Sequence, residues 1–223
     1  MPRKSSPHAA PSRRDLTHAR ILDIAAREVR AKGYERVGVA DVMKQAGLTH
    51  GGFYAHFPSR DAMLAEAIEH AGRTSAGVLA ERIEARRPGV SAFAALVGHY
   101  LSEAHLAGPE RGCVVAALAS EMARQPAALA DAATTRVRSL IATVERALPP
   151  GSPADAATTV AATLVGSLQI ARALGADGGG KAVLAAARQT LIAQYDVQGD
   201  AAMAAGSASN PPRRRATHAP SDG

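Results

Sequence analysis

Residues 47–57, Gly-Leu-Thr-His-Gly-Gly-Phe-Tyr-Ala-His-Phe, are the most informative stretch of the 223-residue chain. Gly47 stands where a helix commonly ends in a left-handed residue, and Thr49 is a side chain suited to cap the exposed N–H groups of a new helix. Pro58 ends that helix soon after it starts. The stretch therefore predicts a tight turn followed by a very short helix, rich in groups that can contact DNA.

Two apolar stripes with the three-and-four spacing of one helix face precede this turn. They consist of Leu22, Ala25, Ala26 and Val29 in the first and Val39, Val42, Met43 and Ala46 in the second. Gly33 follows the first stripe, and a new helix, capped near Ser59 and Asp61, extends to about Ala85. The order is helix, helix, turn, short helix and long helix, which is typical of a helix-turn-helix.

A helix-turn-helix needs apolar residues on the buried side of its second helix. Phe53 and Phe57, four apart, meet this need, and Leu48 would fill the turn. The outward face then consists of Thr49, His50, Gly51, Gly52, Tyr54 and His56. Two adjacent glycines in a helix cost about 1 kcal/mol each relative to alanine, which suggests that a phosphate or base edge approaches the backbone closely. The alternative for Tyr54 and His56 is ordinary packing on the domain surface.

The excess of positive charge lies in the first quarter of the chain. Residues 1–60 hold 11 Lys and Arg against 5 Asp and Glu, whereas residues 61–195 hold 12 of each kind. This asymmetry favours an N-terminal module that binds a polyanion, attached to a neutral body. The alternative is a basic face that only keeps the protein soluble.

The composition favours an all-α protein. Aromatic residues make up 3% of the chain and alanines are abundant, so closely packed helices are expected rather than a β-sandwich. After the long helix, helical patterns continue over residues 91–107, 113–124, 127–148, 154–174 and 181–195. Gly- and Pro-rich interruptions, such as 178–180, separate them. We expect about nine helices and no strand.

Residues 16–68 resemble the N-terminal domain of the TetR/AcrR family of bacterial transcriptional regulators. Gly47-Leu48-Thr49, together with the run Tyr54-Ala55-His56-Phe57-Pro58-Ser59-Arg60-Asp61, carries the resemblance. The resemblance implies that Thr49 and His50 contact bases or phosphates at the start of the short helix. It also implies phosphate contacts by Tyr54 and His56, and by Arg60 at the start of the next helix. Arg60 stands where the family usually has lysine, at a helix N-terminus suited to a phosphate.

Two positions depart from the family pattern. Gly38 occupies the place of a Thr that caps the second helix and touches a phosphate, although glycine is a tolerable cap. Gly52 stands where Thr is frequent, which removes one candidate base contact.

The resemblance also implies a regulator, in the expected form a repressor, that leaves a palindromic operator when a small-molecule inducer binds its C-terminal helical domain. Segments 154–174 and 181–195 would pair with their two-fold copies as a four-helix interface of a homodimer. The alternative is an internal helix pair of a monomer.

We expect Phe93, Tyr100, Cys113 and Met122 to line the ligand site. Cys113, at the expected start of a helix, could instead sense oxidants or electrophiles, or be packed and inert. No metal site is expected, because His99, Glu103 and His105 lack identifiable further ligands.

An enzymatic alternative rests on residues 175–181, Gly-Ala-Asp-Gly-Gly-Gly-Lys, which superficially fit a phosphate-binding loop. Ala182 lacks the hydroxyl that would hold magnesium, and the preceding segment has a helical pattern where a strand is needed. We therefore expect no enzymatic activity and no cofactor.

The expected organisation has four parts. They are a disordered basic arm (1–14), a helix-turn-helix DNA-binding domain (15–60), a helical ligand-binding and dimerisation domain (61–196) and a disordered tail (197–223). One cysteine requires no oxidising compartment, and no uninterrupted apolar run reaches about 18 residues, so a cytoplasmic protein without a membrane partner is expected.

Overall fold

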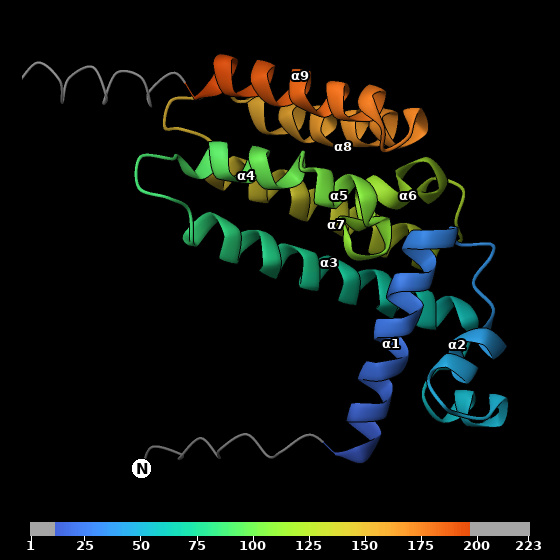
Figure 1. The fold of residues 1–223 in the computed structure, drawn as a ribbon. Coiled ribbons are helices and arrows are strands. Elements are labelled where there is room, and N and C mark those ends of the chain that lie inside the picture. The colour runs from blue at the N-terminus through green and yellow to red at the C-terminus, as the bar shows by residue number, and fades with distance from the viewer. Residues whose placement is uncertain (1–11, 197–223) are drawn as a thin grey trace, which may run out of the picture.

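The computed structural model describes residues 12–196, which contain nine α-helices, two short 3-10 helices and no strand. Figure 1 shows their arrangement. The bounds are α1 Arg13–Lys32, α2 Val39–Gln45, η1 His50–Ala55, α3 Arg60–Glu84, α4 Ala92–Tyr100, α5 Glu103–Ala107, η2 Pro109–Arg111, α6 Val114–Met122, α7 Ala127–Ala147, α8 Ala156–Leu174 and α9 Gly178–Tyr195. The all-α prediction is confirmed. The expected tail, and most of the expected arm, lie outside the described residues.

The helices form two regions that we call the head (α1, α2 and η1) and the body (α4 to α9). Figure 1 shows the head at one end of the molecule, with α3 extending from it along the body. α3 packs against α1 on one side and against α4 and α7 on the other. The domain boundary expected after residue 60 therefore falls at the first residue of a helix that both regions share.

The first helix begins inside the segment that was expected to be a disordered arm. Ser12 and Asp15 form a capping box, in which Asp15 N–H donates to Ser12 Oγ at 3.2 Å and Ser12 N–H donates to Asp15 Oδ2 at 3.0 Å. Arg13 and Arg14 are consequently helical. The boundary at residue 14 was wrong by these residues, because the cap was not recognised in the sequence.

The segment expected as one helix over 91–107 is two helices. α4 ends at Tyr100, and Ser102 starts α5 by accepting a hydrogen bond from His105 N–H at 3.2 Å. This interruption turns the chain and lets His105 fold back toward the end of α4, where its Nδ1 bonds the Tyr100 carbonyl.

The glycine run at 178–180, which we expected to separate helices, is the first turn of α9. Asp177 caps this turn by accepting from Gly179 N–H at 3.1 Å. A Cβ on Gly180 would collide with the Gly175 carbonyl oxygen and lie 2.5 Å from that of Ala171. The glycine lets α9 start directly over the end of α8. Because α8 precedes the run, the strand that a phosphate-binding loop needs is not there.

Among the described helices, α8 is the one long and apolar enough to cross a membrane by length and composition, with a mean hydropathy of 1.2. In the structure it packs against α6, α7 and α9. Its large residues Leu164 and Leu168 are fully buried, while Ile170 and Leu174 remain 56% and 54% exposed. The helix therefore serves the core of the body and leaves an apolar patch outside.

Candidate nucleic-acid interface and the adjoining cavity

The predicted turn between α2 and η1 has the backbone that its sequence indicates. Gly47 has a φ of +67°, in the left-handed region that favours glycine. Leu48 N–H returns to the Met43 carbonyl at 2.9 Å, which closes the end of α2, and the Leu48 side chain packs against the core. The turn prediction is confirmed.

The element after the turn is a 3-10 helix rather than an α-helix. Thr49 occupies the N-cap position of η1, but its side chain makes no capping hydrogen bond, so the capping role predicted for it was wrong. Only its carbonyl is used there, accepting from Gly52 N–H at 3.1 Å. In a 3-10 helix the N–H three residues further on reaches the carbonyl, so Gly52 bonds the Thr49 carbonyl. The Thr49 side chain is exposed to solvent.

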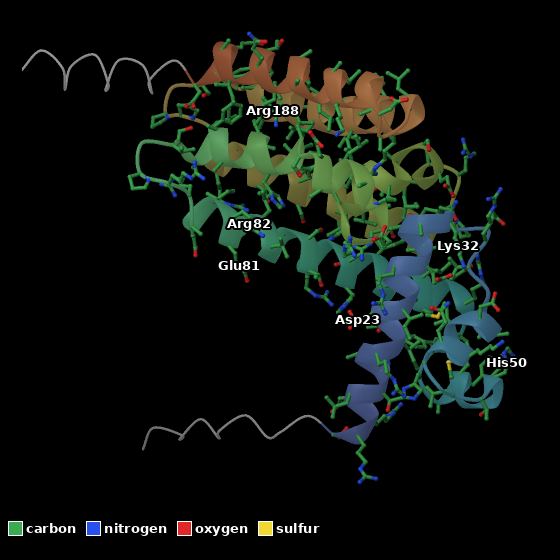
Figure 2. The ribbon with its side chains drawn as sticks, in the orientation of Figure 1. Asp23, Lys32, His50, Glu81, Arg82 and Arg188 are labelled. Carbon is green, nitrogen blue, oxygen red and sulfur yellow. The ribbon has the colours of Figure 1, made fainter. Side chains whose placement is uncertain are left out.

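The two faces of η1 divide as the spacing of its aromatic residues predicts. Phe53 and Phe57 are buried at 2% and 0% exposure and stack with ring centroids 5.6 Å apart. Tyr54 points outward with 70% of its surface exposed, and His50 and Gly51 are exposed beside it. Figure 2 shows His50 at the edge of the head on the side away from α1. The outer face is thus polar, narrow and uncovered.

Among residues 12–196, packing does not require the glycine pair of η1. A Cβ on Gly51 would meet no described atom within 4 Å, and one on Gly52 would meet only Met43 and Thr49, at ordinary contact distances of 3.7 and 3.8 Å. Neither residue has a positive φ. Alanine would therefore fit at both positions and would favour a helix.

His56 is less available than the sequence pattern indicates. Its ring lies 5.9 Å from that of His18, which itself stacks on Phe57 at 4.5 Å. Burial, with smaller contributions from His18 and Arg14, lowers the pKa of His56, and its Nδ1 is buried without a partner among the described residues. A neutral imidazole with one accessible nitrogen is a weaker phosphate ligand than a charged one.

Arg60 holds the backbone of the head. Its Nε donates to the Val37 carbonyl at 2.9 Å, its Nη2 donates to the Tyr34 carbonyl, and its Nη1 lies 3.5 Å from the Asp61 carboxylate. The guanidinium therefore braces the loop between α1 and α2 at the start of α3. This role was not apparent from the sequence, because it depends on where the loop passes.

Arg14 adds a contact that the sequence interpretation missed when it assigned this residue to the arm. Its Nη2 donates to the Ala55 carbonyl at 2.8 Å, which joins the first turn of α1 to the last residue of η1. His18, one turn further along α1, bonds Glu66 of α3 at 2.9 Å. Through Arg14, α1 thus holds η1 in place.

An open cavity of about 640 Å³ lies in the body next to the head. It lies between α3, α4, α7 and the segment from α5 to the start of α6. Its side chains include Val78, Leu79, Arg82, His99, Tyr100, His105, Cys113, Val115, Arg136 and Leu140. The arginines were not foreseen, because no spacing in one segment shows which helices converge on one space.

Of the four residues expected to line a ligand site, Tyr100 and Cys113 line this cavity. Phe93 is fully buried on another side of α4, where its ring meets that of Tyr195 edge-on at 6.0 Å. Met122 is buried in the core at the end of α6. The prediction placed these two wrongly, since apolar periodicity marks a buried side chain without showing whether it faces a cavity or a neighbouring helix.

His105 forms part of the cavity wall as a neutral, fixed ring. Its Nδ1 bonds the Tyr100 carbonyl at 2.7 Å, so Nδ1 carries the proton, and its Nε2 accepts from Cys113 N–H at 3.0 Å. Burial lowers the pKa of His105 to about 4. Both nitrogens are used, and Glu103 pairs with Lys181 at 2.7 Å. Within residues 12–196 no three His, Cys, Asp or Glu side chains are grouped to hold a metal.

Two polar contacts connect the head to the body beside this cavity. Arg30 of α1, which is 8% exposed, donates from Nη1 to the carbonyl of Gly112 at 3.0 Å, and Gly112 lines the cavity. The Tyr34 N–H donates to Glu121 of α6 at 3.1 Å. A Cβ on Gly33 would lie 2.6 Å from the same carboxylate, so a side chain there would disturb this contact. The cavity wall and the first helix of the head are directly bonded.

Comparison with known proteins agrees with this architecture. The model of the bacterial regulatory proteins of the tetR family matches residues 21–67, which include the C-terminal part of α1, the helix-turn-helix and the start of α3. No curated protein matches the sequence.

Several solved structures share the fold at low identity. A TetR-family transcriptional regulator from Agrobacterium tumefaciens has a TM-score of 0.65 and 22% identity over 82% of this chain and 98% of its own. Reduced E. coli NemR has a TM-score of 0.66 and 19% identity over 78% and 96%. AibR, solved with isovaleryl coenzyme A and operator DNA, has a TM-score of 0.59 and 17% identity over 78% and 97%.

These likenesses concern the fold alone, while the family match covers the helix-turn-helix with the exposed face of η1. Together they indicate a head of the tetR-family type on an all-helical body. Residues 21–67 match the bacterial regulatory proteins of the tetR family, and the described chain is similar in fold to solved TetR-family transcriptional regulators.

Proposed function

We propose that the protein is a homodimeric repressor that binds a near-palindromic operator and leaves it when a small molecule occupies the cavity of the body. The observation that carries this proposal is the exposed face of η1, whose glycine pair is not required by packing against any residue that the structure describes. A cytoplasmic site of action is part of the same proposal.

We assign DNA contact to Thr49, His50, Gly51, Gly52, Tyr54, His56 and Arg60. The four residues at the start of η1 would approach base edges and phosphates, and the exposed Tyr54 hydroxyl would bond a phosphate. Arg60 has one nitrogen not committed to the loop carbonyls. Arg60→Ala should lower the slope of log affinity against log salt by about one unit if it contacts phosphate. An unchanged slope with lower stability would leave Arg60 a loop brace only.

A homodimer would form through α8 and α9. These helices pack against each other, and Ile170 and Leu174 expose apolar surface on α8. Two heads on a two-fold axis are needed to read two half-sites one helical turn apart. Ile170→Glu should convert the dimer to a monomer in sedimentation velocity, whereas Val90→Glu, at a 38% exposed loop residue, should not. A wild-type monomer would remove this part of the proposal.

The route from the cavity to the operator would run through Arg30. Its bond to Gly112 joins α1 to a wall of the cavity, so an occupant that displaces the wall biases the position of the head. Such an occupant weakens DNA binding only if it binds better to a conformation whose heads have another separation.

In-vitro selection of duplexes by the purified protein tests the proposal. We expect enrichment of a near-palindromic sequence, bound by two protomers, and its release by members of a small-molecule pool. His50→Ala should alter the preferred sequence. Protein that ignores all duplexes even at low ionic strength would overturn the assignment of η1. Selected duplexes that no small molecule releases would overturn only the role of the cavity.

A second candidate trigger is chemical modification of Cys113. This residue is the N-cap of α6, lines the cavity and has its N–H held by His105, so a reactive electrophile in the cavity would meet the thiol. Alkylation of Cys113 should then release the operator in wild type and have no effect on Cys113→Ser. Operator affinity untouched by complete alkylation would dismiss this trigger.

A further inference from the structure

The charged residues that line the cavity all have one sign. Arg82, Arg111 and Arg136 contribute guanidinium groups, and no Asp or Glu occurs among the lining residues that the structure describes. His105 is neutral, as shown above, and burial lowers the pKa of His99, so the cations are the arginines. Arg111 is 79% exposed in its side chain and pairs with Glu110 at 3.5 Å. Arg82 is exposed on α3, whereas the Arg136 side chain is only 12% exposed, so Arg136 is the cation that the cavity wall holds away from solvent.

The charge of Arg136 is only partly balanced. Its Nη2 lies 3.0 Å from Glu69 Oε2, but the same oxygen lies 3.8 Å from Nη1 of Arg73. The single carboxylate of Glu69 thus pairs with two guanidinium groups, so these three side chains together carry one net positive charge beside the cavity. The Arg136 side chain crosses α3 at Gly72, where a Cβ would collide with its Cδ. The glycine gives the arginine its place beside the cavity.

Two buried groups of the wall have no nitrogen or oxygen partner among the described residues. They are Nε of Arg136 and the hydroxyl of Tyr100, which has only the Cys113 thiol beside it. Burial raises the pKa of Tyr100 well above its ordinary value, so its hydroxyl stays protonated and can donate. An unsatisfied buried donor costs about 1–3 kcal/mol, and an acceptor on a ligand would remove that cost. Both groups therefore favour an occupant that brings oxygen acceptors.

Most of the remaining wall is apolar. It includes Ala76, Val78, Leu79, Val114, Val115 and Leu140. The volume of about 640 Å³ is that of a site for a small organic molecule. Such a wall rejects a strongly hydrated ion and accepts a hydrocarbon chain or ring.

We infer that the cavity selects amphipathic carboxylates, with the carboxylate at Arg136 and the hydrocarbon part along Leu79, Val115 and Leu140. The inference rests on the proposed effector role, because it names the chemical class of the molecule that would occupy the same cavity. A guanidinium binds a carboxylate through two directed hydrogen bonds, which an alcohol cannot reproduce and an amine opposes.

Decanoate, decanol and decylamine, each below its aggregation limit, are matched probes for calorimetric titration of the free protein. Wild type should bind decanoate about tenfold or more tightly than decanol, the ratio expected from one charge-assisted contact, and decylamine least. Arg136→Gln should bring decanoate and decanol to within about threefold, while Arg136→Lys should keep most of the preference. Arg138→Gln, at an exposed position of the same helix, is the matched control and should keep it fully.

Arg136→Gln could unfold the body by stranding Glu69. The variant Glu69→Gln covers this case, because it leaves the Arg136 charge less balanced and should increase the preference for decanoate. Equal binding of the three probes by wild type, binding of none, or a preference that Arg136→Gln leaves intact would overturn the inference. Decanoate that binds but leaves the selected operator bound contradicts the effector role and not the ligand class. If decanol binds and releases the operator as well as decanoate does, this result contradicts the ligand class and not the effector role.

Discussion

The head and the body use the same alanine-rich chain to build interiors of opposite kinds. The head is filled by large rings, since Tyr34, Phe53 and Phe57 are at most 2% exposed and the two phenylalanines stack. The body leaves about 640 Å³ open. Under the proposed function, a head that presents η1 in one position needs close packing, while a body that answers to a small molecule needs space. The contrast can be tested by changing each interior in turn.

The largest expected effect is in the head. Phe57→Ala removes a fully buried ring from its core and should lower the free energy of unfolding by about 3–5 kcal/mol. Tyr54→Ala, at a residue of η1 that is 70% exposed, should change it by no more than about 0.5 kcal/mol. Urea denaturation of both variants gives the comparison. A similar loss in both would mean that the two faces of η1 are not distinct.

The second effect belongs to the body and depends on pH. The pKa of His105 is about 4 in the folded chain, below its ordinary value of 6.5. Between these values the unfolded chain holds the extra proton, so stability falls as pH drops from 6.5 to 4, by about 3 kcal/mol in total.

Denaturation of wild type and His105→Gln across this range isolates the contribution. The substitution should flatten the curve below pH 6.5, whereas His50→Gln, at an exposed residue of the head, should leave its shape unchanged. Parallel curves for wild type and His105→Gln would contradict the buried, neutral state of the ring.

The third effect compares added volume. Ala25 of α1 has no exposed surface, and Ala76 of α3 lines the cavity. Ala25→Leu should therefore destabilise the protein by about 1–3 kcal/mol through overpacking. Ala76→Leu should stay within about 0.5 kcal/mol and reduce ligand binding instead. Thermal melts of the two variants with and without decanoate separate loss of stability from loss of ligand binding. Equal destabilisation by Ala25→Leu and Ala76→Leu would contradict an open cavity at Ala76.

The smallest effect concerns the contact between the regions. Arg30→Gln shortens the side chain that bonds Gly112 and should weaken the coupling between ligand and operator by about 1 kcal/mol, or roughly fivefold in the ligand-dependent change of DNA affinity. Affinity for each partner alone should change less. Lys32→Gln, at the same end of α1 but paired with Glu28 inside the helix, is the control. Full coupling in Arg30→Gln would exclude this route.

The sequence predicts the head better than the body because the signals of the head are local. The turn could be foreseen from Gly47, the end of the short helix from Pro58, and its buried face from the spacing of the phenylalanines, because each signal concerns only neighbouring residues. The cap by Ser12 was equally local and was overlooked. The neighbours of Arg60 could not be foreseen, because its acceptors lie in a loop that precedes it by more than twenty residues.

The cavity was predictable only in part. Tyr100 and Cys113, which were expected in a ligand site, line the cavity, but Phe93 has the same apolar pattern and faces Tyr195. Arg136 reaches the cavity because Gly72, on another helix, leaves room for it. Such pairings between distant segments leave no periodic signal in either one. Gly180 was misjudged for the same reason, since the close passage over α8 explains it.

α1 is held at both extremities, by Arg14 on the Ala55 carbonyl and by Arg30 on the Gly112 carbonyl. A helix of 20 residues is about 30 Å long, so it acts as a lever whose far arm magnifies a small tilt. A rotation of about 5° would swing the η1 extremity by roughly 2–3 Å, enough to lose contact with a groove at that arm length. A small displacement of the cavity wall would thus become a displacement of η1 large enough to break its contacts with the duplex.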